Sequence, residues 1–549
     1  MRRVPSALTL DSIPARFGVA FALVLALKWD TLLRPPWWDS AMGLFPAAIT
    51  LAENGFDLLA LLGMPGYEHG GPNGHSTSPV TLVVALVLRV TGGGPVAFAV
   101  LHLMNYAVTA AALVVLHRLV TPVLGRGTAA LFCVVCLLHP VFSVQAGTMY
   151  LEMPLFLCAV CALAAWLDRR PGRAALWATL AVTIKETGLI VPASLAMAAL
   201  VARGPLEGRL RRAALLVAGP SAWIVGTRLL RRAAAADSDD FEYVPSLDAV
   251  FGGMAQYVER FLFNVPDLLL LLAIFVVAFT MSIPRVWGAL RGATPAGDDT
   301  PAPPTTPTPA TPGGPGEQEA DRVLALVALP IVFFLLLFMV ALPLVAGFSI
   351  VLPRYFTVIL PFLLLWAGHA VMRLAGESAR RAATVTFAGL GLLFAVNTNG
   401  ALYPPDVDTE GPGNDHPLAE RSNAYRRLQD LQLEAMRAVE ALPDVPVFYG
   451  HHEHFLLRWP ELGYVSGPLP DGHDLWTESL VGLVTDREFP PCIYVLYNYP
   501  WLGGTEVLKL VRFADEHPVL DVQTVLELSE GRYRITLALI HRRGADCPS

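Results

Sequence analysis

The feature that most constrains this chain is a series of long apolar segments that exclude charged residues. Of its 549 residues, 54% are hydrophobic and only 15% are charged, whereas about 25% of the residues in an average soluble domain are charged. The mean hydropathy is +0.51. A helix of about 20 apolar residues is long enough to cross a lipid bilayer. The sequence therefore predicts an integral membrane protein with many spans, and it excludes a soluble enzyme held by a single anchor.

Arginines around the apolar segments set the predicted orientation. Arg2, Arg3 and Arg16 precede the first segment, and no small-residue cleavage site follows it, so this segment is predicted to be a retained span with a cytoplasmic N-terminus. The stretch Pro79–Thr91 is too short to cross and is predicted to be a juxtamembrane helix. Eleven spans are predicted in all. They start at Phe17 and then cover about 96–118, 128–146, 151–167, 174–184, 187–202, 213–230, 267–283, 323–345, 356–373 and 382–399.

The remaining regions have other compositions. Residues 292–321 are rich in Pro, Thr, Ala and Gly and are predicted to form a disordered cytoplasmic loop. Residues 35–95 form the first exoplasmic loop with its juxtamembrane helices. Residues 401–549 return to a soluble composition, and an odd number of spans exports them. The predicted fold is a polytopic α-helical membrane protein of about 11 transmembrane helices, residues 1–400, followed by a small exoplasmic α/β domain.

Within this domain, apolar residues at helical spacing predict a helix over 419–442. Strands are predicted at 445–449, 492–497, 522–528 and 533–540. Cys492 and Cys547 both belong to the domain, where an oxidising exterior permits a disulfide.

Ionisable residues beside the apolar segments are the candidates for a functional site, because charges inside a bilayer cost several kcal/mol. Lys185, one of three lysines in the chain, interrupts an apolar stretch together with Glu186. Asp39 follows the first span, Glu152 opens the fourth, and Arg354 precedes the tenth. Each also has a structural interpretation: an internal Lys–Glu pair, a carboxylate at the membrane interface, or an arginine that reaches lipid headgroups.

Together these residues predict two carboxylates and two cations on one side of the membrane. Such a set suits group transfer from a lipid phosphate. An attacking hydroxyl needs a base to take its proton, and the phosphate leaves as an anion that needs positive charge. A glycosidase differs, because its leaving group needs a second, protonated carboxylic acid.

A series of short motifs follows one another along about the first 400 residues. They are Asp39 at the exit of the first span, Ala48–Gly55, the segment from Gly74 to Pro79, Glu152, the break Lys185-Glu186-Thr187-Gly188, and Pro353-Arg354-Tyr355. In the order of these motifs the sequence resembles the GT-C superfamily of glycosyltransferases that use polyprenyl-phosphate sugars, especially the branch of protein O-mannosyltransferases and the lipid A aminoarabinose transferase.

The resemblance implies that Asp39 is the catalytic base and that Glu152 lies near the acceptor or a divalent cation. Lys185 and Arg354 would contact the donor phosphate. Glu186, Tyr355 and His75 complete the implied substrate-binding residues. No definite cofactor follows from the sequence, and a divalent cation is left open.

The function predicted is an inverting glycosyltransferase of the cytoplasmic (inner) membrane of a bacterium. It would move a sugar from a polyprenyl-phosphate donor to a lipid, glycan or protein acceptor on the outer face, among the lipids of the membrane. The alternative is a secondary transporter or flippase for a charged lipid or sugar, whose charges would lie at the middle of the bilayer. A net charge of −7 gives no basic excess for nucleic acid, which is excluded as a partner.

Overall fold

The chain divides into two compact units in the computed structural model. The first contains residues 1–29, 65–80 and 103–398, and the second contains residues 30–64, 81–102 and 399–549. Helix α4 (Gly94–Leu124) begins in the second unit and continues in the first. The structure describes residues 12–37, 40–58, 78–234, 266–292, 315–341, 353–397, 425–442, 445–449, 451–469, 472–474, 491–499, 504–530 and 533–547.

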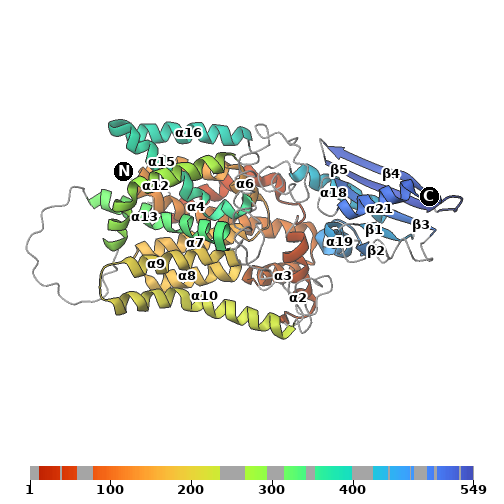
Figure 1. Cartoon of the computed structure of the whole chain (residues 1–549), viewed down its shortest axis with the longest axis horizontal. Helices are drawn as coiled ribbons and strands as arrows, with labels where there is room; N and C mark the ends of the chain where they lie inside the picture. Colours follow the sequence, from red (N-terminus) through yellow and green to blue (C-terminus); the bar gives the residue numbers. More distant parts are fainter. Residues whose placement is uncertain are drawn as a thin grey trace, which may run out of the picture. The chain divides into compact units, whose positions relative to one another are not determined.

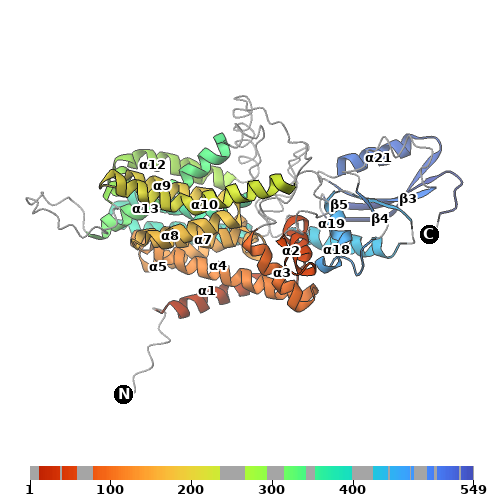
Figure 2. The ribbon, with the colours of Figure 1, turned by 90° about the horizontal axis from the view of Figure 1, so that it is seen from below.

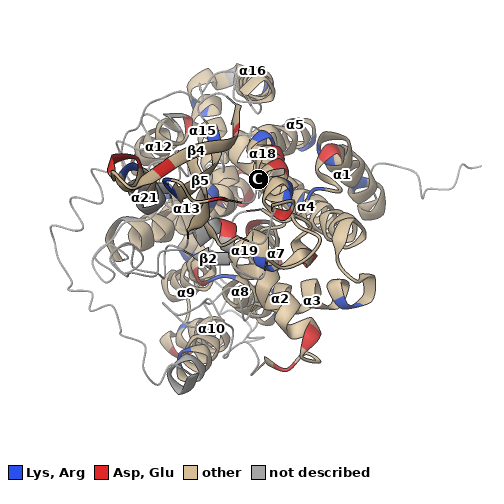
Figure 3. Ribbon diagram, turned by 90° about the vertical axis from the view of Figure 1, so that its right-hand side faces the viewer, with Lys and Arg blue, Asp and Glu red and all other residues tan. Residues whose placement is uncertain are grey.

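The first unit is a bundle of helices that are uncharged over most of their length (Figures 1, 2 and 3). Helix α7 packs against α8, and α10 packs against both α8 and α9. In chain order the helices of this unit are α1 (Ile13–Lys28), α4, α5 (Arg126–Leu138), α6 (Pro140–Gly147), α7 (Glu152–Leu167), α8 (Pro171–Ile184), η5 (Glu186–Leu189), α9 (Ile190–Val201), α10 (Leu206–Ala234), α12 (Pro266–Gly292), α13 (Pro315–Leu336), η6 (Leu337–Ala341), η7 (Pro353–Val358), α15 (Leu360–Ala375), η8 (Gly376–Ser378) and α16 (Ala379–Asn397).

Prolines set where several of these helices begin. Pro14, Pro140, Pro171 and Pro361 occupy the first turns of α1, α6, α8 and α15. At that position a proline loses no helical hydrogen bond, and its fixed φ already suits the helix. The residue before a proline is pushed out of the helical region. His139 accordingly has ψ 129°, and α5 and α6 meet at a bend of 73°.

Among the described residues, three helices are long and apolar enough to cross a membrane: α4, α12 and α16. The bent pair α5 and α6 makes a fourth if it counts as one span. The eleven predicted spans are therefore not confirmed. Helices α7, α8, α9 and α15 have 12 to 16 residues. At 1.5 Å per residue each rises roughly 18–24 Å, less than the ~30 Å of a hydrocarbon core.

The C-terminal end of the segment predicted to be a disordered loop is helical. Helix α12 ends at Gly292 and α13 already begins at Pro315, so residues 315–321 are helical, which corrects the prediction for that end of the loop. Pro315 at the first position and Glu317 in the first turn both suit a helix start. Residues 293–314 lie outside the described residues.

The second unit contains a five-stranded sheet in the order β2-β1-β3-β5-β4. Strands β1 (Val447–Tyr449), β2 (Gly472–Asp474) and β3 (Cys492–Tyr499) are parallel, whereas β5 (Tyr533–Arg542) pairs antiparallel with both β3 and β4 (Leu520–Glu530). An irregularity between Thr524 and Leu526 shifts the register of β4. The four strands and the helix α18 (Tyr425–Glu440) predicted from sequence are present; β2, α19 (His451–Arg458) and α21 (Gly504–Glu516) were not predicted.

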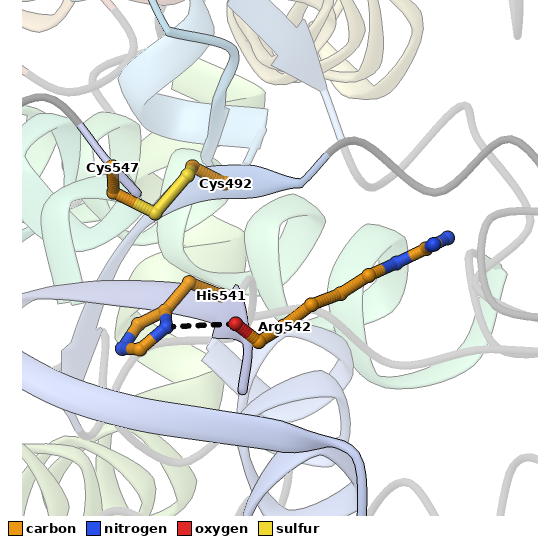
Figure 4. Close-up of a disulfide and its surroundings, with 4 residues drawn as sticks. All are labelled: Cys492, His541, Arg542 and Cys547. Carbon is orange, nitrogen blue, oxygen red and sulfur yellow. Dashed lines mark hydrogen bonds between the residues drawn. A yellow bond between two sulfur atoms is a disulfide. The ribbon is translucent and has the colours of Figure 1, made fainter. Parts of the chain in front are cut away.

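The core of this domain forms where α21 packs against β3 and β4. Leu510 and Ala514 of the helix meet Ile493 and Val495 of β3, all nearly inaccessible to solvent. Helix α18 packs against β4 and β5. Cys492 and Cys547 form a disulfide that links the start of β3 to the chain after β5 (Figure 4).

The segment predicted to be the first exoplasmic loop contributes three described helical segments to the second unit. These are η3 (Ser40–Leu44), α2 (Phe45–Glu53) and α3 (Pro79–Thr91). Helix α3 has the bounds predicted for the juxtamembrane helix. The segment that follows the first helix therefore belongs to the same compact unit as the C-terminal domain.

Candidate active site

Three charged side chains that are far apart in the sequence meet in the first unit: Glu152, Lys185 and Arg354. They are only 3%, 5% and 4% exposed. The Lys185 ammonium donates a hydrogen bond to Glu152 Oε1, and Arg354 Nε lies 3.8 Å from the same oxygen. These are three of the four residues that the sequence predicted to form one site.

Each of these residues lies at the end of a helix rather than along its length. Glu152 is the first residue of α7, where a carboxylate interacts favourably with the helix dipole. Arg354 is the second residue of the short helix η7, which packs against both α6 and α7. Lys185 is the extended residue between α8 and η5, with φ −156° and ψ 142°.

A glycine keeps the break at Lys185 tight. A Cβ at Gly188 would lie 2.3 Å from the carbonyl oxygen of Ala181 in the last turn of α8. The Gly188 amide donates to the Lys185 carbonyl at 2.8 Å. Any larger residue at position 188 would have to displace this backbone. Steric crowding therefore explains why the Lys-Glu-Thr-Gly motif ends in glycine.

Two tyrosine rings border the cations. The Lys185 ammonium lies 4.5 Å from the centroid of the Tyr355 ring. The Arg354 guanidinium lies 5.5 Å from the ring centroids of both Tyr355 and Tyr150. Such distances allow cation–π attraction, which strengthens when water is excluded. The sequence had predicted Tyr355 but not Tyr150.

The loop that leads into Glu152 is supported by polar residues that sequence reasoning missed. Asn105 of α4 donates its amide to the carbonyls of Gln145, Ala146 and Thr148, which lie at the end of α6 and just beyond it. These carbonyls have no partner within the helix at such an end. The amide therefore fixes the chain four residues before Glu152.

Helix α6 is held on another side by Lys28, the last residue of α1. The buried Lys28 ammonium donates to Ser143 Oγ at 2.6 Å, and Tyr106 donates to the Lys28 carbonyl at 2.8 Å. A Cβ at Gly147 would lie 3.2 Å from Lys28 Cδ. The rarity of lysine in the sequence was a signal that could have identified Lys28.

Of the other predicted site residues, Glu186 is described by the structure, whereas Asp39 and His75 are not. Glu186 is exposed and follows the buried Lys185 by one position. Asp39, the predicted base, and His75 lie outside the described residues. The described residues contain no group of three or more His, Cys, Asp and Glu side chains placed to hold a metal ion. Glu152 is engaged by two cations.

The far ends of these helices carry arginines. Helix α7 runs from Glu152 to Leu167, and just beyond it Asp168 pairs with Arg118 at 2.5 Å. Helix α9 runs away from the Lys185 break, and beyond its end the Arg203 amide donates to the Arg291 carbonyl at the end of α12. Arg322 of α13 donates to the carbonyl of Gly292. The Glu152 cluster and these arginines therefore lie at opposite ends of the bundle.

No family model matches the sequence, and no curated protein matches it. Among solved structures, the chain is similar to ArnT from Cupriavidus metallidurans bound to undecaprenyl phosphate, with 15% identity and a TM-score of 0.43. It is similar to the apo state of the same protein with 15% identity and a TM-score of 0.42. Both matches cover 96% of this chain and 98% of the other.

Proposed function

We propose that this protein is a membrane glycosyltransferase that moves a sugar from a polyprenyl-phosphate donor to an acceptor hydroxyl on the outer face of the cytoplasmic membrane. The observation that carries the proposal is the meeting of Lys185, Arg354 and Glu152 in one buried cluster. Buried ion pairs contribute little net stability, because desolvation offsets their attraction. Ionisable groups at membrane depth are therefore functional candidates by default.

In the proposed site the two cations bind the donor phosphate. An arginine and a lysine offer a planar fork of N–H donors and a compact ammonium, both of which suit phosphate oxygens. As the bond between the anomeric carbon and the phosphate oxygen breaks, the phosphate keeps the electron pair. The cations then stabilise the leaving group without a proton donor. Glu152 orients both cations, since they converge on one of its oxygens.

Asp39 is proposed as the base. The acceptor oxygen attacks the anomeric carbon from the side opposite the phosphate, and its proton passes to the Asp39 carboxylate. One new carbon–oxygen bond replaces the old one, with inversion. No step in this scheme uses a metal ion.

The charge distribution of the first unit supports a site on the outer face. Arginines prefer the cytoplasmic ends of membrane helices, and the ends opposite the Glu152 cluster carry Arg118, Arg291 and Arg322. The disulfide between Cys492 and Cys547 supports an exoplasmic C-terminal domain, because such bonds persist in oxidising compartments. A transporter site would lie where spans are interrupted at the middle of the bilayer, whereas the Glu152 cluster lies at the end of the bundle opposite these arginines.

The test is a transfer assay on the purified full chain in lipid nanodiscs, with radiolabelled polyprenyl-phosphate sugars as donors. Lys185→Met should raise the donor KM about tenfold or more, because a charged hydrogen bond to phosphate is lost. Lys185→Arg should recover part of this affinity. The matched control is Arg118→Gln at the opposite end of the bundle, which should leave donor use unchanged. Transfer from none of the donors by the native chain would refute the proposal.

A further inference from the structure

The second unit holds the chain that leads into Asp39 by contacts with the C-terminal domain. Residues 30–37 connect the end of the first helix to this predicted base. Their partners lie on α18 and at Tyr464, 394 to 428 positions later in the sequence. We call these contacts the Trp37 anchor; its described members are Arg34, Pro35, Pro36, Trp37, Tyr425, Gln429, Asp430, Gln432 and Tyr464.

Trp37 is the centre of the anchor. Its indole Nε1 donates to Gln432 Oε1 at 2.9 Å, and its ring stacks on Tyr425 with 5.1 Å between centroids. Trp37 and Gln432 are both buried. A buried indole needs a hydrogen-bond partner, and this one is supplied by a side chain of the C-terminal domain.

The two prolines before Trp37 are held through their carbonyls. Gln429 Nε2 donates to the Pro35 carbonyl at 2.8 Å, and the Tyr464 hydroxyl donates to the Pro36 carbonyl at 3.0 Å. A proline has no backbone N–H, so its carbonyl is the one backbone group that can be bound. Both are bound here by buried side chains of the domain.

Charged contacts hold the start of the segment. Arg34 binds Asp430 through two hydrogen bonds, of 2.7 and 3.2 Å. The imidazole of His102 lies 3.2 Å from the Arg34 carbonyl. Asp30 pairs with Arg426 of the same helix, α18.

The chain is also fixed after Asp39. The Ser40 amide donates to the Trp37 carbonyl at 3.3 Å, and Ser40 is buried. Segment η3, which starts at Ser40, packs against α19 of the C-terminal domain. Fixed residues therefore stand directly before residue 38 and directly after residue 39.

We propose that the Trp37 anchor positions Asp39 for the transfer reaction, so that Gln432 and Tyr464 are positioning residues of the enzyme. This inference rests on the proposed function, which assigns Asp39 as the base. Ten residues separate Lys28 from Asp39, and a free chain of that length could extend up to roughly 33 Å. A displacement of about 1 Å at a reacting group can cost 100-fold in rate. Contacts with the C-terminal domain restrict residues 34–37 of this chain.

The test uses Trp37→Phe, Gln432→Leu and the double variant in the full chain in nanodiscs. Trp37→Phe keeps an aromatic ring against Tyr425 but loses the N–H donor and part of the ring volume. Each variant should lower kcat about 10- to 100-fold and leave the donor KM unchanged. The double variant should be no slower than the slower single variant, because both remove one hydrogen bond. The matched control is Ser466→Ala, which removes a hydroxyl bond to Glu440 in the same domain and should keep the native kcat.

A combination with Asp39→Asn separates positioning from general destabilisation. In the Asp39→Asn background, Gln432→Leu should cause no further loss of residual activity, because the base it positions is gone. A further loss as large as in the native background would overturn the inference. A native kcat in both Trp37→Phe and Gln432→Leu would also overturn the inference. The proposed function would still stand in that case if the native chain transferred sugar and Asp39→Asn reduced the transfer.

Hydrogen exchange gives a readout that needs no substrate. The amides of residues 34–44 should exchange faster in Gln432→Leu than in the native chain, and at the native rate in Ser466→Ala. Unchanged exchange in Gln432→Leu would refute the anchor even if the protein transferred no sugar at all.

Discussion

The first unit holds its site residues with buried charges, whereas the second holds Pro35, Pro36 and Trp37, just before Asp39, with neutral hydrogen bonds. Glu152, Lys185 and Arg354 depend on one another, because removal of one leaves a buried charge without its partner. Trp37 and Gln432 can be replaced together by apolar groups, since no charge remains. Mutation should therefore couple stability to activity in the first unit and separate them in the second.

The largest effect is expected at Glu152. Glu152→Ala leaves two buried cations without this carboxylate, and it should lower the free energy of unfolding by about 3–5 kcal/mol. Thermal or denaturant unfolding in detergent measures the change. The control is Asp168→Ala, which breaks the exposed pair with Arg118 and should cost at most about 1 kcal/mol. Equal losses in the two variants would show that burial does not distinguish the pairs.

The next effect concerns the disulfide of the second unit. Cys547→Ser opens a loop of 55 residues and should destabilise the C-terminal domain by about 2–4 kcal/mol. Hydrogen exchange of β3 and β5 in the full chain measures this loss. A reductant should have the same effect on the native protein and none on the variant. Cys161→Ala, at a free cysteine of the first unit, should leave this exchange unchanged.

The smallest effect is a pH dependence at Glu440. The Ser466 hydroxyl, with the backbone amides of Ser466 and Gly467, lowers the pKa of the Glu440 carboxyl. A lowered pKa in the folded state gives stability that is present above the unfolded pKa and is lost as pH falls through the folded pKa. This carboxyl is largely exposed, so the contribution should stay below about 1 kcal/mol. Unfolding of the native chain and Ser466→Ala should differ at pH 7 and converge in acid; a difference that grew in acid would contradict this sign.

The sequence predicted local features well. The 13 residues of Pro79–Thr91 form one helix, and α18, β3, β4 and β5 lie where periodicity placed them. It also predicted that Glu152, Lys185 and Arg354 would lie together. Charged residues in or beside membrane segments usually face the interior of the helix bundle and pair with one another. Helix length was predicted less well. Residues 128–146 were predicted as one span, but the chain bends by 73° before Pro140 and forms the two helices α5 and α6.

Contacts between distant polar residues could not be predicted from local pattern. Nothing near Trp37 indicates that its partner is Gln432, and nothing near Ser143 indicates Lys28. The periodic pattern of apolar residues predicts an amphipathic helix, but it does not show which glutamine of that helix accepts a hydrogen bond. Such pairs depend on the tertiary fold, which cannot be inferred from the local pattern of a single sequence.

The irregularity in β4 has a consequence for self-association. Strand β4 is the last strand of the described sheet, and an open outer strand offers unpaired backbone groups to a neighbouring copy. The register shift between Thr524 and Leu526 twists this strand, while Asp521 and Glu527 pair with Arg543 and Arg534. Copies confined to one membrane collide often, and a twisted, charged border of this kind discourages them from stacking into a continuous intermolecular sheet.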